Sequence, residues 1–405
     1  MDKETIISIL KRWNLWDKKI DAGIKRKRYA KKIWPYMERK EILVLKGIRR
    51  AGKSTILKQL MKELVKNKVK KQDILYLNLE DYNFANSLNI SLFEEVLEAY
   101  RAYFKNKGKV YYFIDEVQKI KGWEKWLRTK YDIGENIKFV ITGSSASLLS
   151  KELSTLLTGR NISFKIMPLS FKEFAEFSQN GHLEEYLIFG GFPEVVLEKS
   201  EEKKLTLLQQ YFDDIIHKDI IDRYSIRNSK QLIEIARYLV GASGSKVSIN
   251  KLSKVFGISK ETISIYISYM IDACLLFEVT YFSYSAKIRH DVSKLPKLYA
   301  VDNGFINAVS VKYNQNKGQM FENAVLIKLL EQNDEVSYWS ELQSEVDFVV
   351  KGSAINVTST DNIPKREELG LYNFQKGRKG FSSILVTKSI NSKTRVSLNE
   401  FLLKN

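Results

Sequence analysis

The sequence of 405 residues is poor in the residues that build disulfide frameworks and zinc sites. Its single cysteine, Cys274, excludes an internal disulfide framework and fits a reducing compartment; we expect it to be a small core residue in an apolar helix. The three histidines are scattered and lack cysteine partners, so no zinc-site spacing is present. Only five prolines and a hydrophobic content of 44% indicate an ordered globular protein. The length is enough for about two or three domains, each with its own core.

The sequence also lacks a segment that would carry it to or through a membrane. Met1 is followed by Asp2, Lys3 and Glu4 rather than by an apolar core, so no secretory signal is expected. No apolar run approaches the about 20 residues of a membrane-spanning helix. We therefore expect a cytoplasmic protein without a membrane partner.

Positive charge is abundant. The formal net charge is +18 at pH 7, which favours polyanionic partners without naming one. The densest basic patch, Lys25-Arg26-Lys27-Arg28, lies in residues 1–40, which we expect to form a basic helical N-terminal segment. A polyanion contact and an ordinary solvated helix face are both open for this patch.

Residues 47–54 fit a phosphate-binding loop, in which two glycines separated by four residues are followed by Lys and Ser. Glycines let successive backbone N–H groups turn toward an anion, and the helix that follows adds its positive end. Lys53 is expected to reach the outer phosphates of ATP, and the Ser54 hydroxyl to ligate Mg²⁺. The predicted nucleotide-binding residues are Gly47, Ile48, Arg49, Arg50, Ala51, Gly52, Lys53, Ser54 and Thr55.

Two further buried strands predict hydrolysis. The strand over 110–116 ends in Asp115, expected to hold the Mg²⁺ shell, and in Glu116, expected to orient and deprotonate the attacking water. The strand over 138–145 carries hydroxyls at its carboxyl end. Ser144, with Thr142 as the alternative, is predicted to sense the γ-phosphate, while ordinary turn chemistry is the competing interpretation.

The alternation of strands and helices through residue 166 predicts an α/β fold, a parallel sheet with helices on both faces. Its ligand should lie at the carboxyl ends of the strands. We assign residues 41–169 to this P-loop ATPase core, including a helix over 147–158. Residues 170–228 are predicted to form a helical lid or linker, with Ser170 as an N-cap and a long helix over about 202–222.

Residues 229–310 carry the pattern of a winged helix-turn-helix, with helices over 231–240 and 248–256, a Gly257 turn, and a helix from Lys260. A contact with DNA and a role in protein contact or scaffolding are both open. The predicted core is Leu252, Val255, Ile263, Ile267 and Met270. The predicted exposed face of the second helix is Lys260, Thr262, Ser264 and Tyr266, thin in positive charge for reading a major groove. The more basic wing holds Lys287, Arg289, His290, Lys294 and Lys297.

Residues 311–405 are predicted to form a small α/β domain. The expected elements are a helix over 320–331, strands over 336–340, 345–350 and 354–358, a helix over 365–375 and a strand over 383–387.

Together these residues resemble a large prokaryotic family of archaeal-type P-loop ATPases close to AAA+. In that family the ATPase core carries a winged helix and a C-terminal domain similar to PD-(D/E)xK nucleases. The resemblance implies an ATPase that uses Lys53, Ser54, Asp115 and Glu116, with Arg160 as a phosphate-contacting or intersubunit arginine. The stretches that carry it are GIRRAGKST at 47–55, FIDEVQ at 113–118, ITGSSASLLS at 141–150, LLTGR at 156–160, PLSFKEF at 168–174, GGFPEVV at 190–196, HKDIIDRYSIRN at 217–228, KLYAVDNG at 297–304, FENAV at 321–325 and EVDFVV at 345–350.

The sequence departs from the nuclease-type members of that family. Glu322 and Asp347 are present, but Asn356-Val357-Thr358 stands where those members have Glu-x-Lys. The missing carboxylate weakens any Mg²⁺ site, and the missing lysine removes a group that would stabilise hydroxide or the transition state. We therefore expect Glu322, Asp347, Asn356 and Thr358 to mark a degenerate nuclease site without cleavage activity.

The sequence as a whole predicts an ATPase in which Mg²⁺-dependent hydrolysis drives a conformational or assembly change, acting on DNA through the winged helix. The alternative is a nucleotide-gated signalling or assembly switch that has a protein partner, or forms a homo-oligomer, and does not bind DNA.

Overall fold

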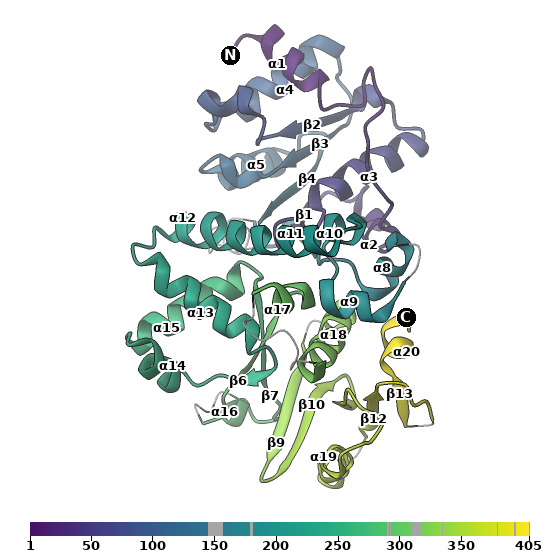
Figure 1. The fold of residues 1–405 in the computed structure, drawn as a ribbon. Helices are drawn as coiled ribbons and strands as arrows, with labels where there is room; N and C mark the ends of the chain where they lie inside the picture. Colours follow the sequence, from purple (N-terminus) through teal and green to yellow (C-terminus); the bar gives the residue numbers. More distant parts are fainter. Residues whose placement is uncertain are drawn as a thin grey trace. The chain divides into compact units, whose positions relative to one another are not determined.

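The computed structural model describes residues 1–144, 157–178, 181–289, 291, 293–309, 317–333, 335–378, 380–392 and 394–404 (Figure 1). The predicted helix over 147–158 therefore lies mostly outside the described residues, as does His290. The chain divides into two compact units, Met1–Ile166 and Met167–Asn405. No helix among the described residues is both long and apolar enough to cross a membrane.

The first unit is built on a five-stranded sheet, in the order β2-β3-β4-β1-β5 for the strands the structure describes. Every strand pair is parallel, which confirms the predicted parallel α/β sheet. Because β4 lies between β1 and β3, the carboxyl ends of these three strands meet at one edge of the sheet. The strands are β1 (Ile42–Gly47), β2 (Ile74–Asn78), β3 (Val110–Asp115), β4 (Ile137–Ser144) and β5 (Asn161–Lys165).

Helices cover both faces of this sheet. Alternate strand residues, such as Val44, Leu77 and Ile114, share one core with α1, α4 and α5. Helix α3 packs on β1 and β4 from the other face. A strand that is buried on both faces reads as a continuous apolar run, which is why these strands were visible in the sequence. The helices are α1 (Lys3–Lys11), α2 (Lys27–Ile33), α3 (Lys53–Lys66), α4 (Ser91–Phe104) and α5 (Trp123–Ile133), with short 3₁₀ segments at Trp34–Tyr36, Lys71–Asp73, Tyr82–Ser87 and Val117–Lys119.

The second unit begins with helices. Ser170 caps α8 as predicted: the Glu173 N–H donates to the Ser170 hydroxyl at 3.2 Å, and the Glu173 carboxylate accepts from the Ser170 N–H at 3.2 Å. The long helix predicted over 202–222 is present but contains a π-helical segment, Ile215–Ile221. The helices here are α8 (Phe171–Ser178), α9 (Leu183–Phe189), α10 (Pro193–Leu197), α11 (Glu201–Asp214), α12 (Asp222–Tyr224), α13 (Ser229–Gly241), α14 (Ile249–Phe256), α15 (Lys260–Asp272), α16 (Ala286–Arg289), α17 (Asn303–Val309), α18 (Lys317–Gln332), α19 (Lys365–Lys376) and α20 (Leu398–Leu403).

A single eight-stranded sheet, counted over the described residues, runs through the rest of the second unit in the order β13-β12-β11-β10-β9-β7-β8-β6. The seam between its two parts is short: β7 pairs in parallel with β9 at Thr280↔Ser337 and Tyr281↔Tyr338. Residues 229–310 and 311–405 therefore share one sheet. The strands are β6 (Ser245–Lys246), β7 (Leu276–Tyr281), β8 (Lys297–Ala300), β9 (Ser337–Glu341), β10 (Ser344–Val350), β11 (Ser353–Val357), β12 (Ser382–Thr387) and β13 (Arg395–Ser397).

A buried carboxylate fixes the Gly190-Gly191 break between α9 and α10. Asp302 accepts hydrogen bonds from the Gly191 N–H at 2.7 Å and the Gly304 N–H at 2.9 Å. Burial raises the pKa of Asp302 to about 7, and these two hydrogen bonds partly oppose that rise. A Cβ at Gly190 would lie 1.6 Å from Asp302 Oδ1, so the break requires glycine there.

Three predictions about α14, α15 and the turn that follows them are wrong. Val255, predicted to lie in the core, is 61% exposed, whereas Tyr266, predicted on the open face of the helix, is 8% exposed. Cys274 is buried but does not lie within a helix; it follows α15 with a left-handed φ of 55°. The sequence patterns placed α14 and α15 correctly, and the other predicted core residues are buried: Leu252, Ile263, Ile267 and Met270.

Gly47, at the end of β1, touches backbone that returns from β5. The Ile166 N–H donates to the Lys46 carbonyl at 2.7 Å. A Cβ at Gly47 would lie 2.0 Å from the Ile166 carbonyl oxygen, which is backbone and cannot rotate away. Glycine is therefore required here by close approach.

We expect Gly47→Ala to lower the free energy of unfolding by about 2 kcal/mol, since the strand end must shift to admit the methyl group. Urea denaturation measures the change. Gly377→Ala is the matched control, because nothing lies within 4 Å of the Cβ it would add. Equal stability of the two variants would contradict the assignment of close packing at Gly47.

Candidate functional site

The predicted phosphate-binding loop connects β1 to the amino end of α3. Arg50 and Gly52 have left-handed φ values of 66° and 90°, so the backbone curls before the helix begins. Lys53 is 5% exposed. Its ammonium donates to the carbonyls of Gly47 and Ile48, both at 3.1 Å. The ammonium thus lies within the loop, and Ser54 and Thr55 occupy the first turn of α3.

An arginine of the N-terminal basic patch supports this loop. Arg26 is 2% exposed, and its guanidinium donates to the Ala51 carbonyl at 2.9 Å. The Arg26 N–H donates to the Gln59 side-chain oxygen at 3.1 Å, which links the patch to α3 as well. The expectation of a wholly solvated or polyanion-facing patch is therefore wrong for Arg26. The contact joins residues 25 positions apart, and nothing in the local pattern indicated it.

The predicted catalytic carboxylates lie at the carboxyl end of β3. Ile114 belongs to the core on the face that carries α1 and α4, so the side chain of Asp115, one residue on, points to the face that carries α3. Tyr76, in the middle of β2, donates its hydroxyl to Asp115 Oδ2 at 2.7 Å. Burial, reinforced by the charge of Asp115, raises the pKa of Tyr76 well above its ordinary value, so the hydroxyl keeps its proton and remains a donor.

Thr142 on β4 connects the two carboxylate residues. Its hydroxyl donates to Asp115 Oδ1 and accepts from the Glu116 N–H at 3.0 Å. Glu116 has a left-handed φ of 58°, and its carboxylate accepts from the Gln118 side-chain amide at 2.5 Å. Thr142 is fully buried, so the alternative assignment of this hydroxyl as a phosphate sensor is replaced by a bridging contact.

Ser144, at the end of β4, is paired in register with Gly47. This pairing sets Ser144 beside the first residue of the phosphate-binding loop, as expected for a side chain that senses the γ-phosphate. Structure and sequence agree on the position of Ser144, and its role stays a prediction.

Arg160 does not join this group within the chain. It precedes β5, and its carbonyl accepts from the Ile42 N–H at 2.9 Å, at the amino end of β1. The phosphate-binding loop follows the other end of β1, five residues or about 16 Å away. The Arg160 guanidinium pairs instead with Asp132 at 2.8 Å. A phosphate contact by Arg160 in its own subunit is thus contradicted, and an intersubunit contact stays a prediction.

The residues of the predicted degenerate nuclease site enclose a lysine. The Lys297 ammonium, at the start of β8, lies 3.1 Å from Glu322 on α18, 2.7 Å from Glu345 and 3.4 Å from Asp347, both on β10. Tyr299 donates its hydroxyl to the same Glu322 oxygen at 2.6 Å. Lys297 is 3% exposed, so it is not available for the DNA contact considered for the basic wing.

Opposite charges stabilise one another in this carboxylate–lysine centre, which consists of Lys297, Glu322, Glu345 and Asp347. Burial disfavours the charged ammonium, but Tyr299 and the three carboxylates outweigh it, and the pKa of Lys297 lies well above its ordinary value. Burial next to Asp347 raises the pKa of Glu322 to about 7. Burial would also raise the pKa of Glu345, but Lys297 and Lys246 reverse the shift and lower it. The ammonium is therefore the resident cation of this centre.

Asn356 and Thr358 contribute differently. The Asn356 side chain accepts from the Asp347 N–H at 3.0 Å and donates to the Glu367 carbonyl at 2.9 Å, so it braces backbone next to Asp347. Thr358 is placed by a backbone bond to Val386. No cluster of three or more Asp, Glu, His or Cys side chains is arranged to hold a metal ion in the part of the chain that the structure describes. Glu345 and Lys297 were not predicted here, although Glu345 lies two residues before Asp347 and so on the same face of β10.

Comparison with known proteins agrees with this geometry. Residues 39–175 match the protein-family model of an AAA domain, and residues 180–316 match Domain of unknown function (DUF8612). The fold and the loop thus define a P-loop ATPase domain of the AAA type. The chain belongs to the same family as Uncharacterized protein MJ1544 of Methanocaldococcus jannaschii, with which it is 35% identical over 336 residues, 77% of this chain and 72% of the relative. An uncharacterized protein of Haemophilus influenzae is 32% identical over 343 residues, 82% of this chain and 84% of the relative.

Two solved structures show more distant similarity. The Aeropyrum pernix Orc1 protein in complex with DNA has 13% identity and a TM-score of 0.31, covering 74% of this chain and 96% of that one. The STAND signal-transduction ATPase PH0952 of Pyrococcus horikoshii has 13% identity and a TM-score of 0.29, covering 78% of this chain and 47% of that one. Both are too distant to bear on function.

We expect Lys297→Met to lower the free energy of unfolding by about 3–5 kcal/mol, because three carboxylates then face one another without the buried ammonium between them. The loss should grow with pH: without Lys297, burial raises the folded-state pKa values of Glu322 and Glu345 above their unfolded values, so the unfolded state releases the protons first. Thermal melts between pH 5 and 8 measure this. Mn²⁺ should raise the melting temperature of the variant and not of the parent, since the vacated oxygens suit a divalent cation.

Lys246→Met is the matched control, because Lys246 pairs with the outer oxygen of Glu345 at 2.8 Å and is partly exposed. If Lys297→Met were no less stable than this control, Lys297 would not be the cation that holds the centre.

Proposed function

We propose that the chain binds ATP and hydrolyses it with Mg²⁺, and that hydrolysis drives a conformational or assembly change. The observation that carries the proposal is the Thr142 hydroxyl, which bonds both Asp115 and the Glu116 backbone on the face of the sheet that carries α3. A metal-shell carboxylate and a water-activating carboxylate are thereby held at the strand end next to the phosphate-binding loop. That arrangement suits phosphoryl transfer to water.

The residues present fit Mg²⁺. Ser54 and Asp115 supply the hydroxyl and carboxylate oxygens that this ion prefers. Each Asp115 oxygen accepts one hydroxyl bond, from Tyr76 or Thr142, and keeps a further lone pair for a metal-bound water. When bound, the ion would neutralise charge on the β- and γ-phosphates.

The protein side chains then have separate roles. Lys53 exchanges two neutral loop carbonyls for phosphate oxygens, which attract an ammonium more strongly because they are charged. Glu116 orients the attacking water and takes its proton. Ser144, beside Gly47, contacts the γ-phosphate. The N–H groups of Lys53, Ser54 and Thr55, in the first turn of α3, would face the phosphates, aided by the positive end of this helix.

We expect Glu116→Gln to bind ATP about as well as the parent while its hydrolysis is about 100-fold slower or more, because the amide cannot take a proton. Equilibrium binding of a fluorescent ATP analogue and phosphate release measure the two quantities. Lys53→Ala is the contrasting variant, which should lose nucleotide binding. Equal turnover of Glu116→Gln and the parent would show that another residue activates the water.

We further propose that residues 229–310 form a winged helix that contacts DNA. Supporting this, the Ser248 and Ser259 side chains cap α14 and α15, and Gly257 makes the left-handed turn between them. Strands β7 and β8 are antiparallel neighbours, with β6 at the edge of the sheet. Lys251, Lys254 and Lys260 are exposed on the two helices. DNA-stimulated ATP turnover is the direct test.

The second candidate function is a nucleotide-gated switch with a protein partner. It is favoured by apolar side chains that α14 and α15 expose, among them Val255 at 61% and Ile265 at 46%. Isolated exposed apolar residues are common, but two on the same pair of helices suit contact with a protein better than contact with a phosphate backbone.

The two candidates predict opposite mutational patterns. If the helices contact DNA, Lys251→Glu/Lys254→Glu should lower DNA-stimulated turnover several-fold, and Val255→Asp should leave it unchanged. Phosphate contacts depend on the lysine charges and not on the apolar side chain. The reverse pattern, in which Val255→Asp abolishes an assembly seen by size-exclusion chromatography with a non-hydrolysed ATP analogue but not with ADP, would favour the switch.

A further inference from the structure

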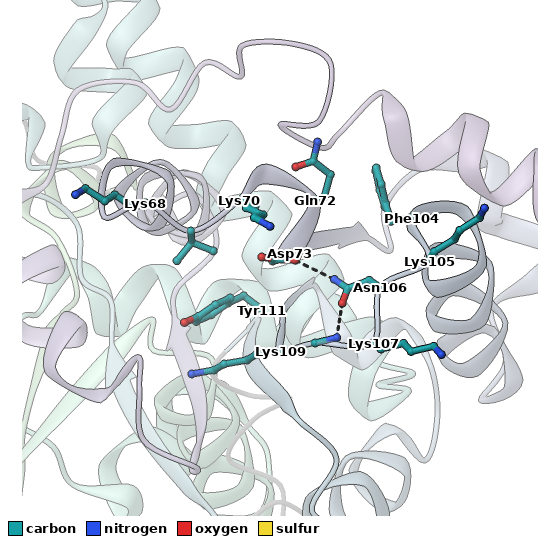
Figure 2. Close-up of a pocket in the computed structure, with 12 residues that line it drawn as sticks. Lys68, Lys70, Gln72, Asp73, Phe104, Lys105, Asn106, Lys107, Lys109 and Tyr111 are labelled. Atoms are coloured by element: carbon teal, nitrogen blue, oxygen red, sulfur yellow. Dashed lines mark hydrogen bonds between the residues drawn. The ribbon is translucent and has the colours of Figure 1, made fainter.

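A basic hollow lies at the amino ends of β2 and β3, within the first unit (Figure 2). Its volume is about 800 Å³. The loop after α3 contributes Lys68 and Lys70, and the loop after α4 contributes Lys105, Lys107 and Lys109. Because β2 and β3 are adjacent and parallel, the loops that enter them lie side by side, which brings the two lysine runs to one place.

The lysine content of the whole chain does not account for this density. Residues 66–73 and 105–109 together hold seven lysines and one aspartate among thirteen residues. Across the full chain, 66 of 405 residues are Lys or Arg. The local share of basic residues is thus about three times the average, with almost no acidic residue to balance it.

Few of these charges are neutralised. Lys109 pairs with Glu38 at 2.6 Å and Lys66 with Glu63 at 4.0 Å, and the hollow's aspartate, Asp73, accepts from the Asn106 amide at 3.0 Å. Within the described ranges, Lys68, Lys70, Lys105 and Lys107 form no ion pair. The carboxyl ends of α3 and α4 point here and oppose an anion, but each contributes only about half a negative charge, less than the lysines supply.

Backbone strain accompanies the lysines in both loops. Lys68 and Lys105 have left-handed φ values of 66° and 50°, just after α3 and α4 end. Glycine usually takes this position after a helix, and a residue with a Cβ costs about 1 kcal/mol more there. Both loops thus carry a long cation at the one position where glycine would relieve strain, as is common where a side chain serves binding.

The character of the hollow indicates its ligand. No arginine is among its lining residues, so bidentate recognition of one phosphate group is not provided. Ammonium groups on flexible stems, spread around a wide polar opening, suit a chain of evenly spaced phosphates. We propose that this hollow binds the phosphodiester backbone of a nucleic acid, independently of base sequence.

The hollow and the proposed ATP site lie at opposite ends of the same strands. Strand β3 begins directly after Lys109 and ends at Asp115, a span of about 17 Å. Nucleic acid and nucleotide can therefore be bound together, with β2 and β3 running directly between them. The purpose of the hollow rests on the proposed ATPase function, whereas binding at the hollow does not.

The test is binding of a short mixed-sequence DNA duplex, and of single-stranded RNA of the same length, to the full chain over a range of salt concentrations. Lys70→Glu/Lys107→Glu should weaken binding and reduce the slope of log affinity against log salt by up to about two, at about 0.9 for each duplex phosphate that the protein no longer neutralises. Lys365→Glu/Lys376→Glu, on exposed positions of α19, is the charge-matched control and should leave the slope unchanged. Comparing the DNA and RNA arms identifies the polymer.

The proposal is overturned if the Lys70/Lys107 variant and the control have the same affinity and slope, or if only Lys251→Glu/Lys254→Glu lowers them. It is equally overturned if the parent binds anionic lipid vesicles through these lysines and no nucleic acid. ATP turnover without nucleic acid, measured in the same variants, separates the two proposals. If the parent shows no turnover, the proposed ATPase function is contradicted. If the Lys70→Glu/Lys107→Glu variant has normal turnover and unaltered nucleic-acid binding, the proposal that the hollow binds nucleic acid is contradicted.

Discussion

The hydroxyl of Thr142 is the contact on which the candidate catalytic end of the sheet depends. A hydroxyl has one proton to donate and lone pairs to accept with, and Thr142 uses both: it donates to Asp115 and accepts from the Glu116 N–H. Holding Glu116 in a left-handed conformation costs about 1–2 kcal/mol, similar to what a buried hydrogen bond returns. The strand order makes this possible, because β4 lies between β1 and β3. Thr142 contacts Asp115 of β3, and Ser144 is in register with Gly47 of β1.

A second polar cluster has the opposite character. At the Thr142 contact, the carboxylates lie beside the proposed ATP site. In the carboxylate–lysine centre, by contrast, they surround Lys297 and form ion pairs with it. An ammonium that touches all three carboxylates supplies the positive charge that would otherwise attract a metal. Asn356 and Thr358 add no charge to this centre, and Asn356 braces the strand backbone around it.

Sequence reasoning found most elements and few of the contacts between them. Helices and strands were predicted to within a few residues, because each depends on periodicity inside a short window. The phosphate-binding loop and the Asp115 strand were found for the same reason. Contacts made across the fold were missed: Arg26 with the loop, and Lys297 with residues 25 to 50 positions away. Tyr266 and Val255 were placed on the wrong faces, because burial of a helix residue depends on what packs against it and no window contains that information.

The two-residue seam between β7 and β9 has a consequence for how this protein can be divided. A fragment that ended near residue 310 would leave β7 with an unpaired edge, which invites pairing with other chains. The same cut would remove Glu322, Glu345 and Asp347, and the buried ammonium of Lys297 would then have no counter-charge. Residues 229–310 and the C-terminal strands are thus a single inheritable piece: a lineage that discarded the C-terminal strands would also weaken the fold of the part before them.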